Sequence, residues 1–395
     1  MVKNRNFVVT CLQHWDVELG CNAIDIAIEI SKNNRVLFLN TPIDYLSYLK
    51  GDPIKYRQQV IHREKPPLRQ INDNLWLLDC PFKALPLNKL KINSIFDWAN
   101  KYNNRKIAGH ILRETQKLGM DRLILFCDND VYRSFYMKEM LQPDIMIYYR
   151  RDNLGNVAYW KKQVKRLEPL LCAKSDLVVA NSDELAEAVK PYHPNTYGIG
   201  QGLNLESYDA NKKYPVPTDI AAIKRPVIGY TGWITSLRLD ADLIYSVASQ
   251  RPQYSFVLVG AEDDVFRKHP VHTLDNVHFL GNKNPSEVPD YIASFNVCFN
   301  PQLINETTIG NNPRKIDEYL ALGKPTVATK TKTMSIFEEC VRNCLMAEEY
   351  VHALDDALNN DSDEKRAKRI ALANSHSWEN NVAKIYEHIN RVSGG

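Results

Sequence analysis

Short apolar runs rich in β-branched and aromatic residues alternate with helical patterns along the whole chain. In the first half these runs predict strands at residues 7–11, 35–40, 75–79, 123–127, 145–149, 177–181 and 196–200. In the second half they predict strands at 226–231, 255–260, 277–281, 296–300 and 325–329, with a further candidate at 343–347. Because such alternation is typical of parallel sheets covered by helices, we predict an α/β protein with two doubly wound sheets in series.

A polar, proline-containing stretch without a sustained period, GLNLESYDANKKYPVPTDIAAIKRP, separates the two halves and is interpreted as a linker. With 395 residues the chain is too long for one ordinary core. We therefore predict a first domain over residues 1–206 and a second over 207–395. Apolar residues at helical spacing near the end predict a last helix at about 376–392, which could pack back on the first domain.

The composition is that of a globular protein, with 44% hydrophobic and 25% charged residues. The first apolar run is too short for a signal peptide or a membrane span, so we expect a cytosolic protein. Eight scattered cysteines without a C-x-x-C pair predict free thiols rather than a zinc site.

Residues 1–206 hold 29 Lys and Arg against 23 Asp and Glu, and residues 207–395 hold 21 against 24. The positive first half would suit an anionic membrane or a phosphate-bearing acceptor, or is merely a solvated surface.

The stretch NNPRKIDEYLALGKPTVAT contains a complete helix. Asn312 suits the N-cap and Pro313 the first helical position, and Gly323 ends the helix, which we predict at about 313–322. A helix start attracts anions, and Arg314 and Lys315 add positive charge, so a pyrophosphate would be held there.

Glu318 lies more than one turn further along the same helix, where its carboxylate could accept hydrogen bonds from the hydroxyl groups of a ribose. The alternative is a surface ion pair between Arg314 and Glu318 at i,i+4 spacing. Glycines 229 and 232, where a predicted strand meets a loop, would let the backbone approach a phosphate. The loop that begins at Gly281 could offer backbone groups to a base.

Three other motifs give weaker signals. GIGQG at 198–202 resembles a dinucleotide fingerprint, but Leu203 stands in place of the third glycine and no helix follows. The D-x-D of Asp128 and Asp130 binds a metal in some sugar-nucleotide enzymes, but here it lies in the first half, far from the nucleotide helix. The chain contains no G-x-x-x-x-G-K-[ST] phosphate-binding loop.

With these motifs in order, the chain resembles the glycosyltransferases of the GT-B fold, and within them the family 4-like group. The segments that carry the resemblance are VVANSDELAE, GIGQGLNLESY, IGYTGWITSLRLDADLI, VHFLGNKNPSEVPDYIASFNVCFNP, NNPRKIDEYLALGKPTVAT and SHSWENNVAKIYEHI. It covers about residues 145–390. The resemblance implies two Rossmann-like domains that face an interdomain cleft and a UDP- or GDP-linked sugar donor, with no metal or other cofactor.

Glu318 matches the second glutamate of the family's Glu-x7-Glu motif, which implies that it contacts the ribose. Gly310 stands where the first glutamate belongs, and Glu306 is out of register. Any role of that first glutamate toward the donor sugar therefore lacks support here. By the same resemblance, Gly232, Arg314 and Lys315 are the phosphate-side residues.

A catalytic base is expected on a loop after a strand of the first domain. Asp152 follows the predicted strand at 145–149, and Arg150 and Arg151 beside it would keep it ionised and could grip an acceptor phosphate. The alternative is a capping residue in an ordinary turn. His14 is the second candidate base, and Trp15 could stack on a sugar or lipid, unless the two are simply buried together.

The basic, aromatic stretch at 156–171 could be an interfacial helix that touches the anionic inner face of the membrane, or a solvated basic helix. Taken together, the sequence predicts a glycosyltransferase that uses a nucleotide-sugar donor and a glycan or lipid-linked acceptor in cell-surface polysaccharide synthesis. We expect no nucleic-acid partner. The rival functions are a sugar-nucleotide epimerase of the same fold and a non-catalytic nucleotide-sugar-binding scaffold.

Overall fold

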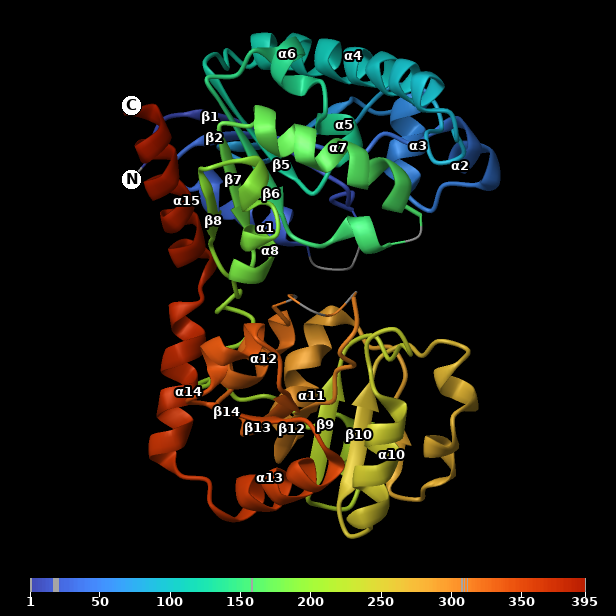
Figure 1. The fold of residues 1–395 in the computed structure, drawn as a ribbon, viewed down its shortest axis with the longest axis vertical. Helices are drawn as coiled ribbons and strands as arrows, with labels where there is room; N and C mark the ends of the chain where they lie inside the picture. Colours follow the sequence, from blue (N-terminus) through green and yellow to red (C-terminus); the bar gives the residue numbers. More distant parts are fainter. Residues whose placement is uncertain are drawn as a thin grey trace. The chain divides into compact units, whose positions relative to one another are not determined.

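The computed structural model describes residues 2–16, 21–157, 159–306, 308, 310 and 312–394. Two predicted segments contain positions outside these ranges, Asn311 in the nucleotide helix stretch and Ala158 in the basic stretch. The chain forms two compact units, the first comprising Met1–Gly200 with Asn381–Gly395 and the second Gln201–Asn380 (Figure 1).

The first unit is built on a mostly parallel sheet, to which the described residues contribute eight strands in the order β3-β4-β2-β1-β5-β6-β7-β8. Only β3 runs antiparallel within this described sheet, paired with β4. The strands are β1 (Asn6–Cys11), β2 (Arg35–Leu39), β3 (Leu68–Asn72), β4 (Leu75–Leu78), β5 (Leu123–Asp128), β6 (Ile145–Arg150), β7 (Leu177–Ala180) and β8 (Thr196–Gly198). Its helices are α1 (Asn22–Ser31), α2 (Tyr45–Lys50), α3 (Lys55–Ile61), α4 (Asn93–Lys117), α5 (Val131–Ser134), α6 (Met137–Leu141), α7 (Lys161–Lys174) and α8 (Asp183–Glu187), with 3-10 turns at Leu154–Asn156 and Lys190–Tyr192.

The second unit contains a fully parallel sheet, with six strands in the described chain in the order β11-β10-β9-β12-β13-β14. They are β9 (Val227–Thr231), β10 (Ser255–Val259), β11 (Val277–Phe279), β12 (Val297–Asn300), β13 (Thr326–Thr329) and β14 (Val341–Cys344). The helices are α9 (Thr218–Ala221), α10 (Ala241–Gln250), α11 (Val288–Ser294), α12 (Arg314–Ala321), α13 (Ala347–Asn359) and α14 (Asp363–Ser375), and α15 (Trp378–Ser393) follows. Turns of 3-10 helix lie at Phe266–Lys268, Pro270–Thr273, Pro285–Glu287 and Thr333–Phe337.

The predicted α/β class with two doubly wound sheets is confirmed, and the predicted strands match observed ones. The last strand was predicted a few residues late, since β14 is Val341–Cys344. The sequence prediction missed β3, because LRQIN lacks an apolar run and this antiparallel strand is half-exposed or exposed throughout. Strands at the edge of a sheet need little apolar surface, so the hydrophobic pattern gives little sign of them.

Part of the predicted linker packs against the second unit. Leu203, Tyr208 and Ile220 are buried and pack in the hydrophobic core of the second unit. The structure accordingly divides the chain after Gly200 rather than after residue 206. The end of α15 joins the first unit, where the Tyr386 hydroxyl group is 2.9 Å from Asn34 Nδ2 and the His388 ring stacks on Tyr197. Among the described residues, no helix is both long and apolar enough to cross a bilayer.

Candidate active site

The carboxyl edge of the second sheet is lined by three glycines with positive φ angles, Gly232 after β9, Gly260 after β10 and Gly281 after β11. They hold the loops together, because Gly232 N–H donates to Val259 O at 2.9 Å and Gly260 N–H donates to Gly281 O at 2.9 Å. A Cβ atom on Gly260 would lie 1.9 Å from the carbonyl oxygen of Gly232. Only glycine permits this approach and conformation, and the loops it joins lie at the carboxyl edge, where ligands of such sheets bind.

Helix α12 starts beside the same edge. Its apolar residues Ile316, Tyr319 and Leu320 are fully buried. The Tyr319 hydroxyl group accepts a hydrogen bond of 3.0 Å from the backbone N–H of Thr231, the last residue of β9. The positive end of the α12 dipole is thereby fixed next to the loop that begins at Gly232.

The N-terminus of α12 differs from the prediction in its cap. The helix begins at Arg314, and Pro313 takes the N-cap position with an extended ψ angle of 102°. Asn312 therefore does not cap the helix as predicted, and its buried Oδ1 atom has no hydrogen-bond partner among the described residues. The predicted helix end is confirmed, since Gly323, with φ +71°, donates to Leu320 O.

Lys315 points toward the glycine edge. Its Nζ atom lies 3.8 Å from the ring centroid of Tyr230 and donates a hydrogen bond to the Tyr230 hydroxyl group. A Cβ atom added to Gly232 would lie 2.8 Å from the same Nζ atom, so the amine borders the glycine loop directly. Burial, together with the nearby charge of Arg238, lowers the pKa of Lys315 to about 7. The sequence analysis did not single out Tyr230 or Arg238, although both belong to the quoted glycine-loop segment.

Glu318 lies one turn further along α12. Its Oε1 atom forms an ion pair with Arg314 Nε at 3.3 Å, and the carboxylate also accepts a hydrogen bond from the Tyr208 hydroxyl group. The ion pair that was the alternative interpretation of Glu318 is therefore present. With 14% of its side chain exposed, Glu318 is held in place rather than turned toward bulk solvent. Gly310, in the position of the family's first glutamate, has φ +82° and is buried.

Successive residues of a strand point to opposite faces of the sheet, and Arg151 directly follows Arg150, the last residue of β6. Arg150 is 4% exposed, and its Nε atom is 3.1 Å from Glu168 Oε1 while Nη1 donates to Leu185 O. The guanidinium group that was predicted to bind an acceptor is therefore fully engaged inside the protein. Arg151 points the other way, and its Nη1 atom lies 3.1 Å from Asp128 Oδ2.

Asp152 follows β6 in a loop that is held by Asn129. The Asn129 side chain accepts hydrogen bonds from the backbone N–H groups of Arg151 and Asp152 and donates to Asp152 O at 3.2 Å. The Asp152 carboxylate is 43% exposed and lies 3.3 Å from Arg151 Nε. It is thus accessible and paired with a cation, as the prediction required of a base. The sequence analysis missed Asn129 as the support of this loop.

His14 is buried and has partners at both ring nitrogens. Its Nε2 atom lies 3.0 Å from Asp79 Oδ1, and Nδ1 accepts a hydrogen bond of 3.2 Å from the backbone N–H of Asp16. Neither nitrogen is available to take a proton from a substrate in this arrangement, which gives His14 a structural role in place of the predicted catalytic one. Trp15 is half-buried and packs edge-on against Phe38 at 5.1 Å.

The weaker motifs have structural explanations. A Cβ atom on Gly202 would lie 2.2 Å from the Trp378 indole ring, and one on Gly198 would lie 2.0 Å from Asp183 Oδ1, so packing requires these glycines. In the D-x-D motif, Asp128 pairs with Arg151, whereas Asp130 pairs with Arg133 at 2.7 Å and caps α5. The two carboxylates thus have separate cationic partners.

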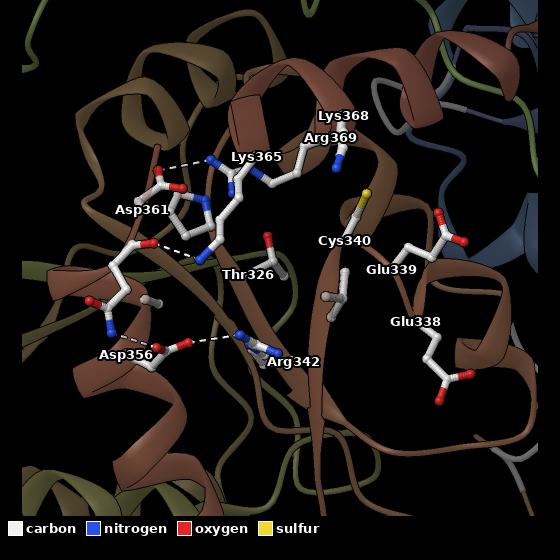
Figure 2. Close-up of a pocket in the computed structure, with 14 residues that line it drawn as sticks. Thr326, Glu338, Glu339, Cys340, Arg342, Asp356, Asp361, Lys365, Lys368 and Arg369 are labelled. Carbon is white, nitrogen blue, oxygen red and sulfur yellow. Dashed lines mark hydrogen bonds and ion pairs between the residues drawn. The ribbon is translucent and has the colours of Figure 1, made fainter. Parts of the chain in front are cut away.

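A pocket of about 120 Å³ in the second unit lies at the amino ends of β13 and β14, near Thr326 and Val341 (Figure 2). Several of its charged residues are paired: Arg342 with Asp356 at 2.9 Å, Arg369 with Asp361 at 2.8 Å, and Lys368 with Glu364, which lies outside the pocket lining, at 2.8 Å. Ligands of doubly wound sheets bind outside the carboxyl ends of the strands. The glycine edge, and not this pocket, is therefore the candidate donor site.

Comparison with known proteins relates this chain to glycosyltransferases. Residues 225–360 match the family Glycosyl transferases group 1. TuaH of Bacillus subtilis strain 168, named as a glycosyltransferase of teichuronic acid biosynthesis, is 27% identical over 183 residues, which cover 44% of this chain and 45% of TuaH. The chain therefore matches less than half the length of this curated relative.

Two solved structures share the fold over nearly the whole chain. Anabaena HepE, solved in complex with UDP and glucose, superposes with a TM-score of 0.64 at 15% sequence identity. The match covers 98% of this chain and 100% of the HepE chain. Sucrose-phosphate synthase from Thermosynechococcus elongatus has a TM-score of 0.66 at 15% sequence identity. The match covers 99% of this chain and 100% of the synthase chain. The solved structures show the GT-B fold, and the family match over residues 225–360 together with the similarity to TuaH supports a group 1 glycosyltransferase.

Proposed function

We propose that this glycosyltransferase moves a sugar from a UDP-linked donor to a glycan or lipid-linked acceptor in the synthesis of a cell-surface polysaccharide. The observation that carries the proposal is the meeting of the glycine edge, the start of α12 and the Lys315 amine, with Glu318 one turn away. The likeness to HepE, solved with UDP and glucose, supports UDP as the nucleotide. The similarity to TuaH supports a polysaccharide product.

In this proposal the diphosphate of the donor lies against Gly232 and the N-terminus of α12, where Lys315 offsets its charge. Glu318 accepts hydrogen bonds from the ribose hydroxyl groups, and Arg314 positions the carboxylate. Gly281 and its loop face the base. Because this edge offers cations and backbone N–H groups to the diphosphate, we expect transfer to persist in EDTA, without a metal.

Asp152 is the proposed catalytic base, which removes a proton from the acceptor hydroxyl group. Its accessibility and its pairing with Arg151 support this role. We expect Asp152→Asn to abolish transfer while the affinity for UDP is unchanged. Unchanged turnover of the true substrate pair would disprove the assignment.

A donor panel tests the function itself. The chain is incubated with UDP- and GDP-linked sugars, and donor loss, nucleotide release and isomerised donor are followed by chromatography. Release of UDP, accelerated by acceptor, supports the transferase. An isomerised donor without release would indicate the epimerase, and binding with neither reaction would indicate a scaffold.

We further propose that the first unit touches an anionic membrane, where lipid-linked acceptors reside. The predicted interfacial helix at 156–171 is only partly available, because α7 starts at Lys161 and Arg166 is paired with Asp97 of α4. An exposed apolar stripe instead runs along the start of α4 beside several lysines. This α4 patch comprises Ile92 at 60% exposure, Ile95 at 46%, Trp98 at 65% and Tyr102 at 43%, with the exposed Lys89, Lys91 and Lys101.

Apolar and aromatic side chains bordered by lysines suit an anionic lipid surface. Flotation with vesicles that contain an anionic lipid should recover the chain at low salt, and Ile95→Ser with Trp98→Ser should abolish recovery. Leu237→Ser, which removes an equally exposed leucine in the second unit, is the matched control. No flotation of the unmodified chain at low salt would refute the membrane contact.

A further inference from the structure

Two cysteines meet at the carboxyl edge of the first sheet. Cys11 is the last residue of β1, and Cys21 precedes α1. Their Sγ atoms are 3.6 Å apart, and the Cys11 thiol donates to Asp128 Oδ2, at the end of β5, over 3.4 Å. Both side chains are almost fully buried, with 1% and 3% of their surface exposed.

The surroundings distinguish the two sulfurs. Cys21 occupies the N-cap position of the ten-residue helix α1, and Arg151 Nη1 lies 3.0 Å from its sulfur. The Cys11 thiol, the Arg151 charge and the backbone N–H of Ala23 stabilise the Cys21 thiolate, and its pKa is lowered to about 6. The hydrogen bond to Cys21, burial and the neighbouring Asp128 charge raise the pKa of Cys11, so Cys11 keeps its proton.

The guanidinium group of Arg151 lies beside Cys21 and Asp128, where a metal ion would otherwise bind. Arg151 Nη1 is 3.0 Å from Cys21 Sγ and 3.1 Å from Asp128 Oδ2. A metal bound to Cys11, Cys21 and Asp128 would have to lie beside this guanidinium group, against strong repulsion. The arrangement is instead that of an activated thiolate with a second thiol within reach.

We propose that Cys11 and Cys21 form a redox-modification site, which hydrogen peroxide converts to a reversible disulfide. The Cys21 thiolate attacks the O–O bond, giving Cys21 sulfenic acid and hydroxide. The Cys11 sulfur then attacks the Cys21 sulfur, its proton leaves through Asp128, and the sulfenic oxygen departs as water. The two sulfurs lose two electrons, one peroxide is reduced, and the sulfurs close from 3.6 Å to about 2.05 Å.

The test treats the reduced chain with a small excess of hydrogen peroxide, alkylates the remaining thiols and maps the disulfides by mass spectrometry. Trypsin leaves both cysteines in one peptide, since no Lys or Arg separates them, but Glu-C cleaves at Asp16 or Glu18. We expect linked peptides that contain Cys11 and Cys21 and that separate with dithiothreitol. Cys11→Ser should leave Cys21 as a sulfenic acid that dimedone traps.

Cys340 is the control, because it is more exposed than the other seven cysteines, while burial raises its pKa. Oxidation of Cys340 before Cys21 would overturn the proposal. The proposal would also be overturned if the purified chain contained one zinc ion per chain and if Cys11 and Cys21 resisted alkylation until a chelator removed the zinc. If Cys11→Ser does not fold, Arg151→Gln supplies the second variant, and it should slow peroxide oxidation of Cys21 about tenfold. None of these readouts depends on the proposed glycosyl transfer.

Discussion

The Lys315 ammonium group lies 3.8 Å from the ring centroid of Tyr230 and donates a hydrogen bond to the hydroxyl group of that ring. The two residues are 85 positions apart in sequence. Their contact brings a titratable cation to the loop where Gly232 leaves β9. The amine is held next to aromatic surface, where its charge is poorly solvated until an anion arrives.

This contact predicts that UDP-glucose binding is coupled to proton uptake. The pKa of Lys315 is lowered from 10.5 to about 7, so at pH 8 the amine is mostly neutral, and a bound diphosphate would restore its proton. Affinity should therefore fall as the pH rises above about 7. Calorimetry of UDP-glucose binding at pH 8 should be run in phosphate and in Tris. The two binding heats should differ by the difference in ionisation heat of the buffers, multiplied by an uptake of nearly one proton. Lys315→Met should remove the difference, and buffer-independent heats in the unmodified chain would contradict the assignment.

The same group affects stability in a defined direction. Between pH 7 and 10.5 the unfolded chain binds the Lys315 proton and the folded chain largely does not. The contribution of Lys315 to the free energy of unfolding thus rises with pH across this window and is constant below it. Urea unfolding of Lys315→Met, compared with the unmodified chain, should show a flatter pH dependence between pH 7 and 9.

Glu318→Gln should separate ribose binding from diphosphate binding. We expect the affinity for UDP to fall about tenfold, the loss of one charge-assisted hydrogen bond, while inorganic pyrophosphate binds as before. Glu364→Gln is the matched control, because Glu364 also forms an i,i+4 pair, with Lys368 at 2.8 Å. An equal loss of affinity for UDP and pyrophosphate would mean that Glu318 serves only to hold Arg314.

Gly232→Ala should impair nucleotide binding. The new Cβ atom would lie 2.8 Å from Lys315 Nζ, at a φ of +127° that side chains rarely adopt. Strain of about 1–3 kcal/mol is expected, together with displacement of the amine. Gly119→Ala provides the control, since Gly119 also has a positive φ, of +62°, but its Cβ atom would meet nothing within 4 Å. Thermal shift with and without UDP should show loss of the ligand response in Gly232→Ala alone.

Arg150→Met should act on stability rather than on acceptor binding. Removing one partner of the buried pair with Glu168 leaves an uncompensated charge and should cost about 3–5 kcal/mol in the free energy of unfolding. Arg122→Met removes one partner of an exposed pair, with Asp144, and should cost less than about 1 kcal/mol. Urea titration measures both. Equal, small losses would show that the Arg150 pair is not the buried contact described.

The sequence by itself determined most of the fold. Apolar runs bounded by turns located thirteen of the fourteen strands in the described chain, because burial of a parallel strand on both faces leaves a local pattern. Helix α12 and its end at Gly323 could likewise be predicted from nearby residues, because helical spacing and a positive φ depend on the local sequence. The missed strand β3 is polar, and hydrogen bonds to β4 define it.

Only the tertiary structure decided which side chains meet. Alternation along a strand implies that Arg150 and Arg151 diverge, but not that one reaches Glu168 and the other Cys21 and Asp128. The same holds for Lys315 on Tyr230 and for His14 on Asp79. Periodicity determines the face of the helix or strand on which a residue lies. The residue that it contacts depends on strand order and register, and these are determined by contacts between segments far apart in the sequence.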